Sequence, residues 1–338
     1  MQSVIVVHPD FDRIWPFAAD RFHERWVAQG PTEFIRLADA DRRPVGEIIA
    51  RPAAVTRLAA LGGLVTLTCA ATLSGLREVA IEPAPEDEVV AALSAAGTRL
   101  YRQPSEGFWG QSVAEFALAL ALCGLRRIPQ LHHAILADTA PWDYTPPGGV
   151  GRPGARGQQF GDAPGFANGT VAGKRVRVVG AGNIASRFAS FAHMLGADVA
   201  AWDPYASEPG FHRAGARREW QLDRLVRDAE IFAPLIPLTA QTRGLVTAAH
   251  IDALPRGCLV VLATRARVCD MNALRRRVLA DQLSLAADVF DVEPLPLDDP
   301  LLGRHNVVHT PHNAGRTSDA NRQWADTLVE QFTPVPPV

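Results

Sequence analysis

Short apolar runs alternate with segments of helical periodicity through the second half of the chain. Runs of four to six β-branched or aliphatic residues, with few charges, are typical of strands buried on both faces of a parallel sheet. The segments between them repeat apolar residues at helical spacing. A strand, helix, strand order of this kind predicts a parallel, doubly wound α/β sheet. We expect strands at residues 175–179, at a run ending at 202, and at 230–233, 258–263, 285–289 and 306–310.

The first hundred residues show a weaker form of the same alternation. It predicts strands at 3–7, 33–37, 48–50 and 64–69, helices at 14–28 and around 54–60, and a surface connection over 76–88. These elements form a second α/β domain. The strand expected at 64–69 leads into a small, glycine-bearing loop that includes Leu73, Ser74 and Gly75. Ligands of open α/β sheets bind at such strand ends. A plain turn explains this loop equally well.

Between the two halves lies an almost wholly apolar stretch. Ser112 and Glu115 have the spacing of a capping box, so a helix is expected to start there and to be buried on all sides. Residues 141–169 carry so many glycines and prolines that we expect a long loop. A final helix is expected over about 319–331.

The strand at 175–179 is followed by a glycine motif for a dinucleotide. Gly180, Gly182 and Ala185 occupy the G-x-G-x-x-G/A positions at the start of a helix, and Asp203 ends the next strand about 20 residues later. Helix amides there would face a pyrophosphate, and the carboxylate would accept hydrogen bonds from a ribose diol. Since an acid repels a 2′-phosphate, the motif favours NAD over NADP.

The composition of the chain limits the classes of partner that it is expected to bind. The 34 basic and 36 acidic residues give a net charge of −2, which provides no field for nucleic acid or an anionic membrane. The four cysteines have neither CxxC nor metal-ligand spacing, and neither a leader nor a membrane span is visible. We therefore expect a cytoplasmic protein with a small-molecule partner and no metal.

Three side chains with catalytic chemistry follow the late strands. Arg265, Glu293 and His312 each lie just past the carboxyl end of an expected strand, so they should converge at one edge of the sheet. Arginine binds a carboxylate or carbonyl, histidine donates a proton, and a carboxylate fixes the histidine tautomer. Taken singly, each also fits an ordinary surface or strand-end residue.

Taken together, the motifs resemble the D-isomer-specific 2-hydroxyacid dehydrogenases. The glycine motif is followed by PLTAQTRGL at 237–245, ATRAR at 263–267, ADVFDVEPLP at 287–296 and NVVHTPHNAG at 306–315. The resemblance implies an NAD-dependent reductase of 2-oxo acids with Arg265, Glu293 and His312 as catalytic residues. It implies backbone amides of Leu73, Ser74 and Gly75 on the substrate carboxylate, and Asp288 on the nicotinamide carboxamide. The implied cofactor-binding residues are Gly180, Gly182, Asn183, Ile184, Asp203, Pro237, Thr242, Ala263, Arg265, Asp288 and His312.

The family also implies an organisation of the whole chain. An NAD-binding Rossmann domain over 112–315 would be inserted into a flavodoxin-like substrate domain formed by 1–111 and 316–338, and the protein would be a homodimer. The sequence departs from the family pattern at two positions. Ala266 replaces the glycine that usually follows the arginine, and Phe116 stands at a position often held by histidine. Phe108, Trp109 and Trp142 could line the substrate pocket, although simple packing explains them better.

Two other functions share this pattern. A cofactor-sensing binding protein, like the corepressors with this fold, would retain the same three residues. A formate dehydrogenase is disfavoured, because that branch has glutamine at the position of Glu293. The specific oxo acid is left open.

Overall fold

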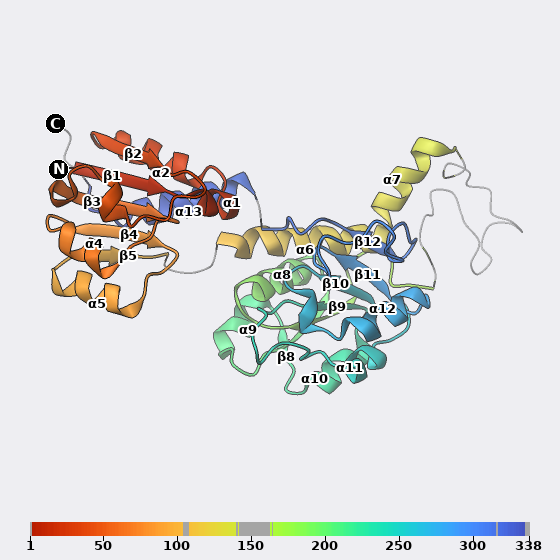
Figure 1. The fold of residues 1–338 in the computed structure, drawn as a ribbon. Helices are drawn as coiled ribbons and strands as arrows, with labels where there is room; N and C mark the ends of the chain where they lie inside the picture. Colours follow the sequence, from red (N-terminus) through yellow and green to blue (C-terminus); the bar gives the residue numbers. More distant parts are fainter. Residues whose placement is uncertain are drawn as a thin grey trace, which may run out of the picture. The chain divides into compact units, whose positions relative to one another are not determined.

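The computed structural model describes residues 2–103, 108–139, 141, 163, 165–315 and 317–334. The chain divides into two compact units. The terminal unit comprises Met1–Phe108 with Arg316–Val338, and the central unit comprises Trp109–Gly315 (Figure 1). The expected boundary after residue 111 thus lies slightly beyond the one between the units. The Gly/Pro-rich segment at 141–169 falls largely outside the described residues, as does Trp142.

The terminal unit is built on a five-stranded parallel sheet in the order β2-β1-β3-β4-β5. Helices cover both faces, and α13 returns from the far end of the sequence to pack beside α2. The Trp324 ring of α13 lies 5.1 Å from Phe11 and 5.3 Å from Trp15, centroid to centroid. The elements are β1 (Gln2–Val7), α1 (Pro9–Ile14), α2 (Ala18–Val27), β2 (Thr32–Arg36), α3 (Val45–Ile48), β3 (Val55–Leu61), α4 (Leu67–Thr72), β4 (Glu78–Glu82), α5 (Asp87–Ala95), β5 (Arg99–Tyr101) and α13 (Ser318–Val329).

The predictions of secondary structure for residues 48–88 are wrong. The helix expected at 54–60 is strand β3, the strands expected at 48–50 and 64–69 are replaced by the end of α3 and by α4, and the expected surface connection contains β4. Tertiary pairing overrides local propensity here. The alanine-rich β3 hydrogen-bonds to β1 on one side and β4 on the other, and Leu58, Ala59 and Ala60 are fully buried.

The central unit contains a seven-stranded parallel sheet in the order β12-β11-β10-β9-β6-β7-β8. The strand from Arg175 to Val179 lies in the middle of this sheet, as the sequence predicts, and the doubly wound fold class is confirmed. The elements are α6 (Phe108–Arg126), α7 (Ile128–Ala137), β6 (Arg175–Val179), α8 (Asn183–Met194), β7 (Asp198–Trp202), α9 (Glu208–Ala214), β8 (Arg217–Arg218), α10 (Leu222–Leu225), β9 (Ile231–Pro234), α11 (Ala248–Ala253), β10 (Leu259–Leu262), α12 (Met271–Leu279), β11 (Ser284–Ala287) and β12 (Val307–His309).

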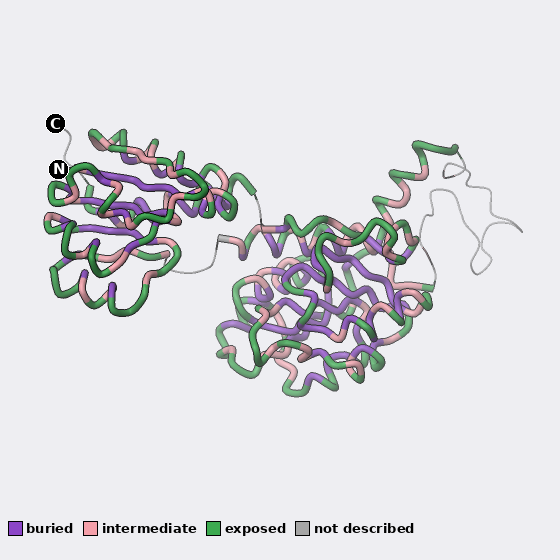
Figure 2. The backbone as a smooth tube through the Cα atoms, in the orientation of Figure 1, coloured by how far each residue is buried: buried purple, intermediate pink, exposed green. Residues whose placement is uncertain are grey.

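The central sheet separates two apolar clusters. One packs β-strand side chains against α6 and α8, and the other packs the opposite face against α10, α11 and α12. Figure 2 shows the inner strands of both units as buried. Since the inner strands bury nearly all of their side chains, Arg57 and Arg177 included, side chains that carry chemistry can reach solvent mainly where strands end.

Helix α6 begins earlier than the capping box predicts. Its first residue is Phe108, so Ser112 lies inside the helix. The Ser112 hydroxyl donates instead to the carbonyl oxygen of Ala314 at 2.5 Å. The expectation of an all-apolar buried helix holds for one face, where Ala114, Ala117 and Leu125 are fully buried. The serine therefore fastens α6 to the segment after β12.

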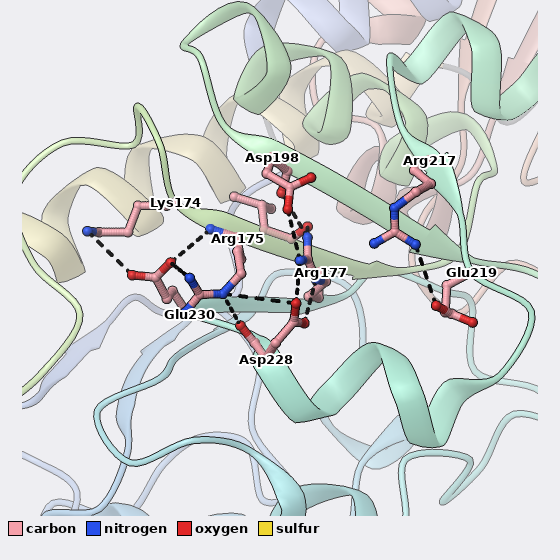
Figure 3. A network of polar contacts seen from close by, with 9 residues as sticks. Lys174, Arg175, Arg177, Asp198, Arg217, Glu219, Asp228 and Glu230 are labelled. Carbon is pink, nitrogen blue, oxygen red and sulfur yellow. Dashed lines mark hydrogen bonds and ion pairs between the residues drawn. The ribbon is translucent and has the colours of Figure 1, made fainter.

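A network of charged side chains lies at the amino-terminal edge of the central sheet (Figure 3). Arg177 on β6 has a side chain only 2% exposed, and it donates to both carboxylate oxygens of Asp228 at 2.7 and 2.8 Å. It also donates to the carboxylate of Asp198 at 3.0 Å. These contacts tie together the starts of β6, β7 and β9 at the edge opposite the glycine motif.

All four cysteines are free thiols. Burial raises the pKa of the Cys258 and Cys269 thiols, which is typical of structural cysteines. Within the part of the chain that the structure describes, none of the helices is both long and apolar enough to cross a membrane.

Candidate functional site

The carboxyl edge of the central sheet contains a topological switch point. Strands β6 and β9 are neighbours, yet the chain leaves β6 toward β7 on one side and leaves β9 toward β10 on the other. The connections that follow these strands diverge and leave a crevice, which is where open α/β sheets bind ligands. All of the expected cofactor-binding residues follow the strands of this sheet.

The glycine motif has the conformation that a dinucleotide needs. Gly180 has a φ of 108°, and a Cβ there would lie 2.8 Å from the Ile236 side chain, so only glycine fits. Gly182 precedes Asn183 and Ile184 at the start of α8, and a Cβ on Gly182 would meet no atom within 4 Å. Open space beside the first amides of a twelve-residue helix fits a pyrophosphate.

Asp203 organises the turn after β7. One carboxylate oxygen accepts the N–H of Ala181 at 2.8 Å, and the other accepts the N–H groups of Tyr205 and Ala206 at 2.9 and 3.0 Å. The carboxylate is thereby held beside the glycine turn and is partly exposed. The oxygen that accepts the Ala181 N–H has a second lone pair, so the position fits a hydroxyl of the ribose diol of an adenosine.

The loops after β9 and β10 are held by threonines. The hydroxyl of Thr242 donates to the Pro237 carbonyl at 2.6 Å, and the hydroxyl of Thr264 donates to the Ile236 carbonyl at 3.1 Å. Ala263 is buried at the end of β10. Pro237, Thr242 and Ala263 therefore lie on neighbouring loops at the carboxyl edge, and Thr242 has a structural partner of its own.

A pocket of about 370 Å³ lies where β10, β11 and β12 end. It brings together the three side chains that the sequence singles out as catalytic, Arg265, Glu293 and His312. Arg265 is exposed and its guanidinium donates to the Thr264 carbonyl at 2.7 Å. The other lining residues are Leu238, Ala266, Arg267, Val289, Phe290 and Asp291.

His312 and Glu293 form a close polar pair in this pocket. The Nδ1 atom of His312 lies 2.7 Å from Oε2 of Glu293, and the other oxygen of Glu293 accepts the N–H of Phe290 at 2.7 Å. The backbone of His312 has a φ of 55°, a left-handed conformation that is uncommon for a residue with a side chain. With Nδ1 occupied, Nε2 is the ring nitrogen left to meet a ligand.

Asp288 has a different environment from the one expected. It is fully buried, and its carboxylate accepts hydrogen bonds from the Thr310 hydroxyl at 2.6 Å and from the N–H groups of Asn313 and Ala314 at 3.1 and 2.8 Å. The described residues therefore engage both oxygens, and Asp288 holds the loop that carries His312. A direct contact of Asp288 with the nicotinamide stays a prediction.

The loop at Leu73, Ser74 and Gly75 follows helix α4 and not the strand expected before it. A Cβ on Gly75 would lie 2.4 Å from the carbonyl oxygen of Ala53, which precedes β3, so the loop lies at the amino-terminal edge of its sheet. The loop was expected to bind substrate because it would follow a strand at the carboxyl edge of the sheet, and it does not lie at that edge. The turn that follows β3 at the carboxyl edge is Gly62-Gly63, which the sequence reasoning missed because it placed no strand at 55–61.

Other expected pocket residues pack elsewhere. Gly315 lies against the Trp109 ring, with a built Cβ 3.2 Å from Cδ1, so Trp109 has a packing role in the central unit. Trp142 and the side chain of Phe108 lie outside the described residues. Reasoning from sequence gave the arginine role to Arg265 rather than Arg267, and both arginines line the pocket. In the described ranges, no group of three or more potential ligand side chains is placed to hold a metal ion.

Comparisons with known proteins agree on one group. The model of the family "D-isomer specific 2-hydroxyacid dehydrogenase, NAD binding domain" matches residues 152–314. The chain is 29% identical over 222 residues to the D-3-phosphoglycerate dehydrogenase of Archaeoglobus fulgidus, a match that covers 65% of this chain and 38% of that protein. It is 32% identical over 164 residues to the hydroxypyruvate reductase of Thermotoga maritima, covering 47% of this chain and 52% of the relative. The chain thus spans well under two thirds of both relatives.

Solved structures share the fold at lower identity. A D-2-hydroxyisocaproate dehydrogenase matches with a TM-score of 0.69 and 18% identity, over 98% of this chain and 95% of the other. The D-lactate dehydrogenase of Escherichia coli matches with a TM-score of 0.59 and 20% identity over the same shares. These similarities show the two-domain arrangement of parallel sheets.

Proposed function

The chain belongs to the D-isomer-specific 2-hydroxyacid dehydrogenases and contains their NAD-binding domain, and from that premise we propose that it reduces a 2-oxo acid with NADH. The observation that supports this best is the pocket that joins Arg265, Glu293 and His312 at the carboxyl edge of the NAD-binding sheet. The reverse reaction would oxidise a D-2-hydroxy acid.

Gly180, Gly182 and the first amides of α8 would hold the pyrophosphate, and Asp203 would hold the adenosine ribose. NADH, when bound, supplies a hydride to C2 of the substrate. Arg265 is exposed to the pocket and is not ion-paired with any acid in the described part of the chain. Its planar fork of N–H donors suits a carboxylate and an adjacent carbonyl oxygen, which it would hold in place.

His312 would donate the proton that completes the reduction. As the C2–H bond forms, the electron pair of the C=O bond moves to the oxygen, and Nε2–H of His312 protonates that oxygen to give the hydroxyl. The Nδ1 contact with Glu293 keeps the ring oriented. It also pairs the positive charge of the imidazolium with the Glu293 carboxylate before the proton is transferred to the substrate. Solvent then returns a proton to His312.

The turn at Gly62-Gly63 would replace Leu73, Ser74 and Gly75 as the source of amides for the substrate carboxylate. Gly63 is buried, and its N–H has no hydrogen-bond partner among the residues that the structure describes. A buried amide without a partner is costly, so it favours an anionic ligand. Replacing Gly63 by alanine would place a Cβ 2.9 Å from Cγ1 of Val45 and so displace this amide, which should raise KM for the oxo acid more than it lowers kcat.

A panel of 2-oxo acids tested with NADH and with NADPH examines the proposal. We expect reduction of at least one acid, with NADH preferred because of Asp203. Tight NADH binding without reduction of any acid would contradict the enzyme and favour the cofactor-sensing alternative. A preference for NADPH would contradict the assignment of Asp203.

We also propose a homodimer in a reducing, cytoplasmic compartment. Helix α7 extends from the rest of the central unit (Figure 1) and has no buried residue, and Ile128, Ile135 and Leu136 on it are 50%, 43% and 73% exposed. An apolar helix left in water favours association with a second copy. Sedimentation of the whole protein should give twice the monomer mass, and a Leu136→Glu variant should sediment as the monomer. The four free thiols support a reducing compartment.

A further inference from the structure

We propose that the substrate carries a second acidic group and that Arg267 binds it. This inference rests on the proposed reduction of a 2-oxo acid and names the class of acid: a dianion, whose second group is a carboxylate or a phosphate. Arg267 would then be a residue that determines specificity, with Arg265 left for the reacting carboxylate and carbonyl.

The two arginine side chains that line the pocket lack acidic partners in the described part of the chain. Arg265 and Arg267 both line it and are both exposed. Their hydrogen-bond partners in the described part of the chain are backbone carbonyls, Thr264 for Arg265 at 2.7 Å and Asp291 for Arg267 at 2.9 Å. Neither guanidinium has an acidic partner within ion-pair distance among the described residues. The pocket therefore presents two cations that are not neutralised by the protein.

The acids of the pocket are already occupied. Asp291 accepts two hydrogen bonds from Arg275, at 2.9 and 3.2 Å, and Arg275 also holds Asp299 at 2.9 Å. Glu293 is engaged with His312. Both acids that line the pocket are thus paired with other side chains, and neither lies within ion-pair distance of Arg265 or Arg267 in the described part of the chain. A monoanionic oxo acid would neutralise one arginine and leave the other.

The anchoring of Arg267 prepares it for such a role. One terminal nitrogen donates to the Asp291 carbonyl, and that segment is itself fixed by Arg275. The remaining N–H groups of Arg267 have no partner among the described residues, so they can form a fork toward an acidic group. A guanidinium held in this way loses less side-chain entropy on binding than a freely moving one.

The test compares kcat/KM for three oxo acids with the whole protein and NADH. The monoanion is 2-oxobutyrate. The acids with a second anionic group, called dianions here, are 2-oxoglutarate, with a second carboxylate, and 3-phosphohydroxypyruvate, whose phosphate adds a charge of about −1.5 to −2 at pH 7. We expect wild type to prefer one dianion over the monoanion by about tenfold or more, since charged hydrogen bonds have this effect. The preferred dianion identifies the second group.

Three variants test whether Arg267 causes the preference for dianions. Arg267→Ala should reduce the dianion-to-monoanion ratio of kcat/KM by about 10- to 100-fold, and Arg267→Lys should retain part of it because the charge remains. Arg224→Ala removes an exposed arginine of α10 outside the pocket and should leave the ratio at the wild-type value. Equal use of monoanion and dianion by wild type, or an unchanged ratio in Arg267→Ala, would overturn the inference and leave the reductase intact. If no oxo acid of a broad panel is reduced, the proposed function itself fails.

Discussion

Nδ1 of His312 lies 2.7 Å from Oε2 of Glu293, and the backbone at His312 is held in a left-handed conformation. The pair therefore has a fixed direction, with Nε2 as the nitrogen that can meet a substrate.

His312→Ala should lower kcat by about 10² to 10⁴, the range for loss of a general acid. NADH affinity, measured by fluorescence titration, should stay close to the wild-type value, because the pyrophosphate and ribose contacts lie elsewhere on the sheet edge. Glu293→Gln should cause a smaller loss, since the amide oxygen still accepts from Nδ1–H. His309→Ala, exposed at the end of β12, is the matched control. A fully active His312→Ala variant would rule out the proton-donor role.

Asp203→Asn should weaken the preference for NADH over NADPH by about tenfold, because it removes the charge that repels a 2′-phosphate. The two dissociation constants measured by calorimetry give this ratio. Asp298→Asn, an exposed acid of the same unit, should not change it. An identical ratio in Asp203→Asn and wild type would mean that another residue selects the cofactor.

Asp288→Asn should destabilise the central unit by about 1–3 kcal/mol, because an amide NH₂ would face the Ala314 N–H that the carboxylate now accepts. Urea unfolding measures the free energy. In the same variant, hydrogen exchange at Asn313 and Ala314 should become faster. Unchanged protection there would contradict the anchoring role of Asp288.

The network around Arg177 predicts a loss of stability in acid. Hydrogen bonding from Arg177 lowers the pKa of Asp228 in the folded state. The charged form is thus favoured by folding, so the stabilisation is complete above the pKa of unfolded aspartate, about 3.9, and is lost as pH falls through the lower folded value. Urea unfolding over decreasing pH should show this slope. Asp228→Asn should flatten it, and Asp298→Asn should not. Because the Asp228 side chain is 50% exposed, the effect should be modest.

The sequence predicted the central unit far better than the terminal unit. Strand Arg175–Val179 matches its expected bounds, and Asp270 caps α12 by accepting the Ala273 N–H at 2.9 Å. In this region apolar runs are flanked by glycines and helix caps, so local signals and sheet pairing agree. The strand ends then place Arg265, Glu293 and His312 at one edge, which the pocket brings together.

Residues 48–88 show why the rest was not predictable. The run at 64–69 has the composition of a strand, but α4 forms there because β1 and β4 pair with Val55–Leu61. Which of two adjacent apolar runs joins a sheet depends on partners distant in sequence. The same holds for Asp288, whose hydrogen bonds come from residues more than twenty positions later.

The position of α13 has a consequence for synthesis on the ribosome. Trp324 is buried against Phe11 and Trp15, so the segment that carries Phe11 and Trp15 exposes an aromatic face until the central unit and α13 have been translated. The central unit, by contrast, is continuous in sequence and can complete its core as soon as it leaves the exit tunnel. The terminal unit therefore starts before the central unit and is completed after it, and during that delay its aromatic face is open to chaperones.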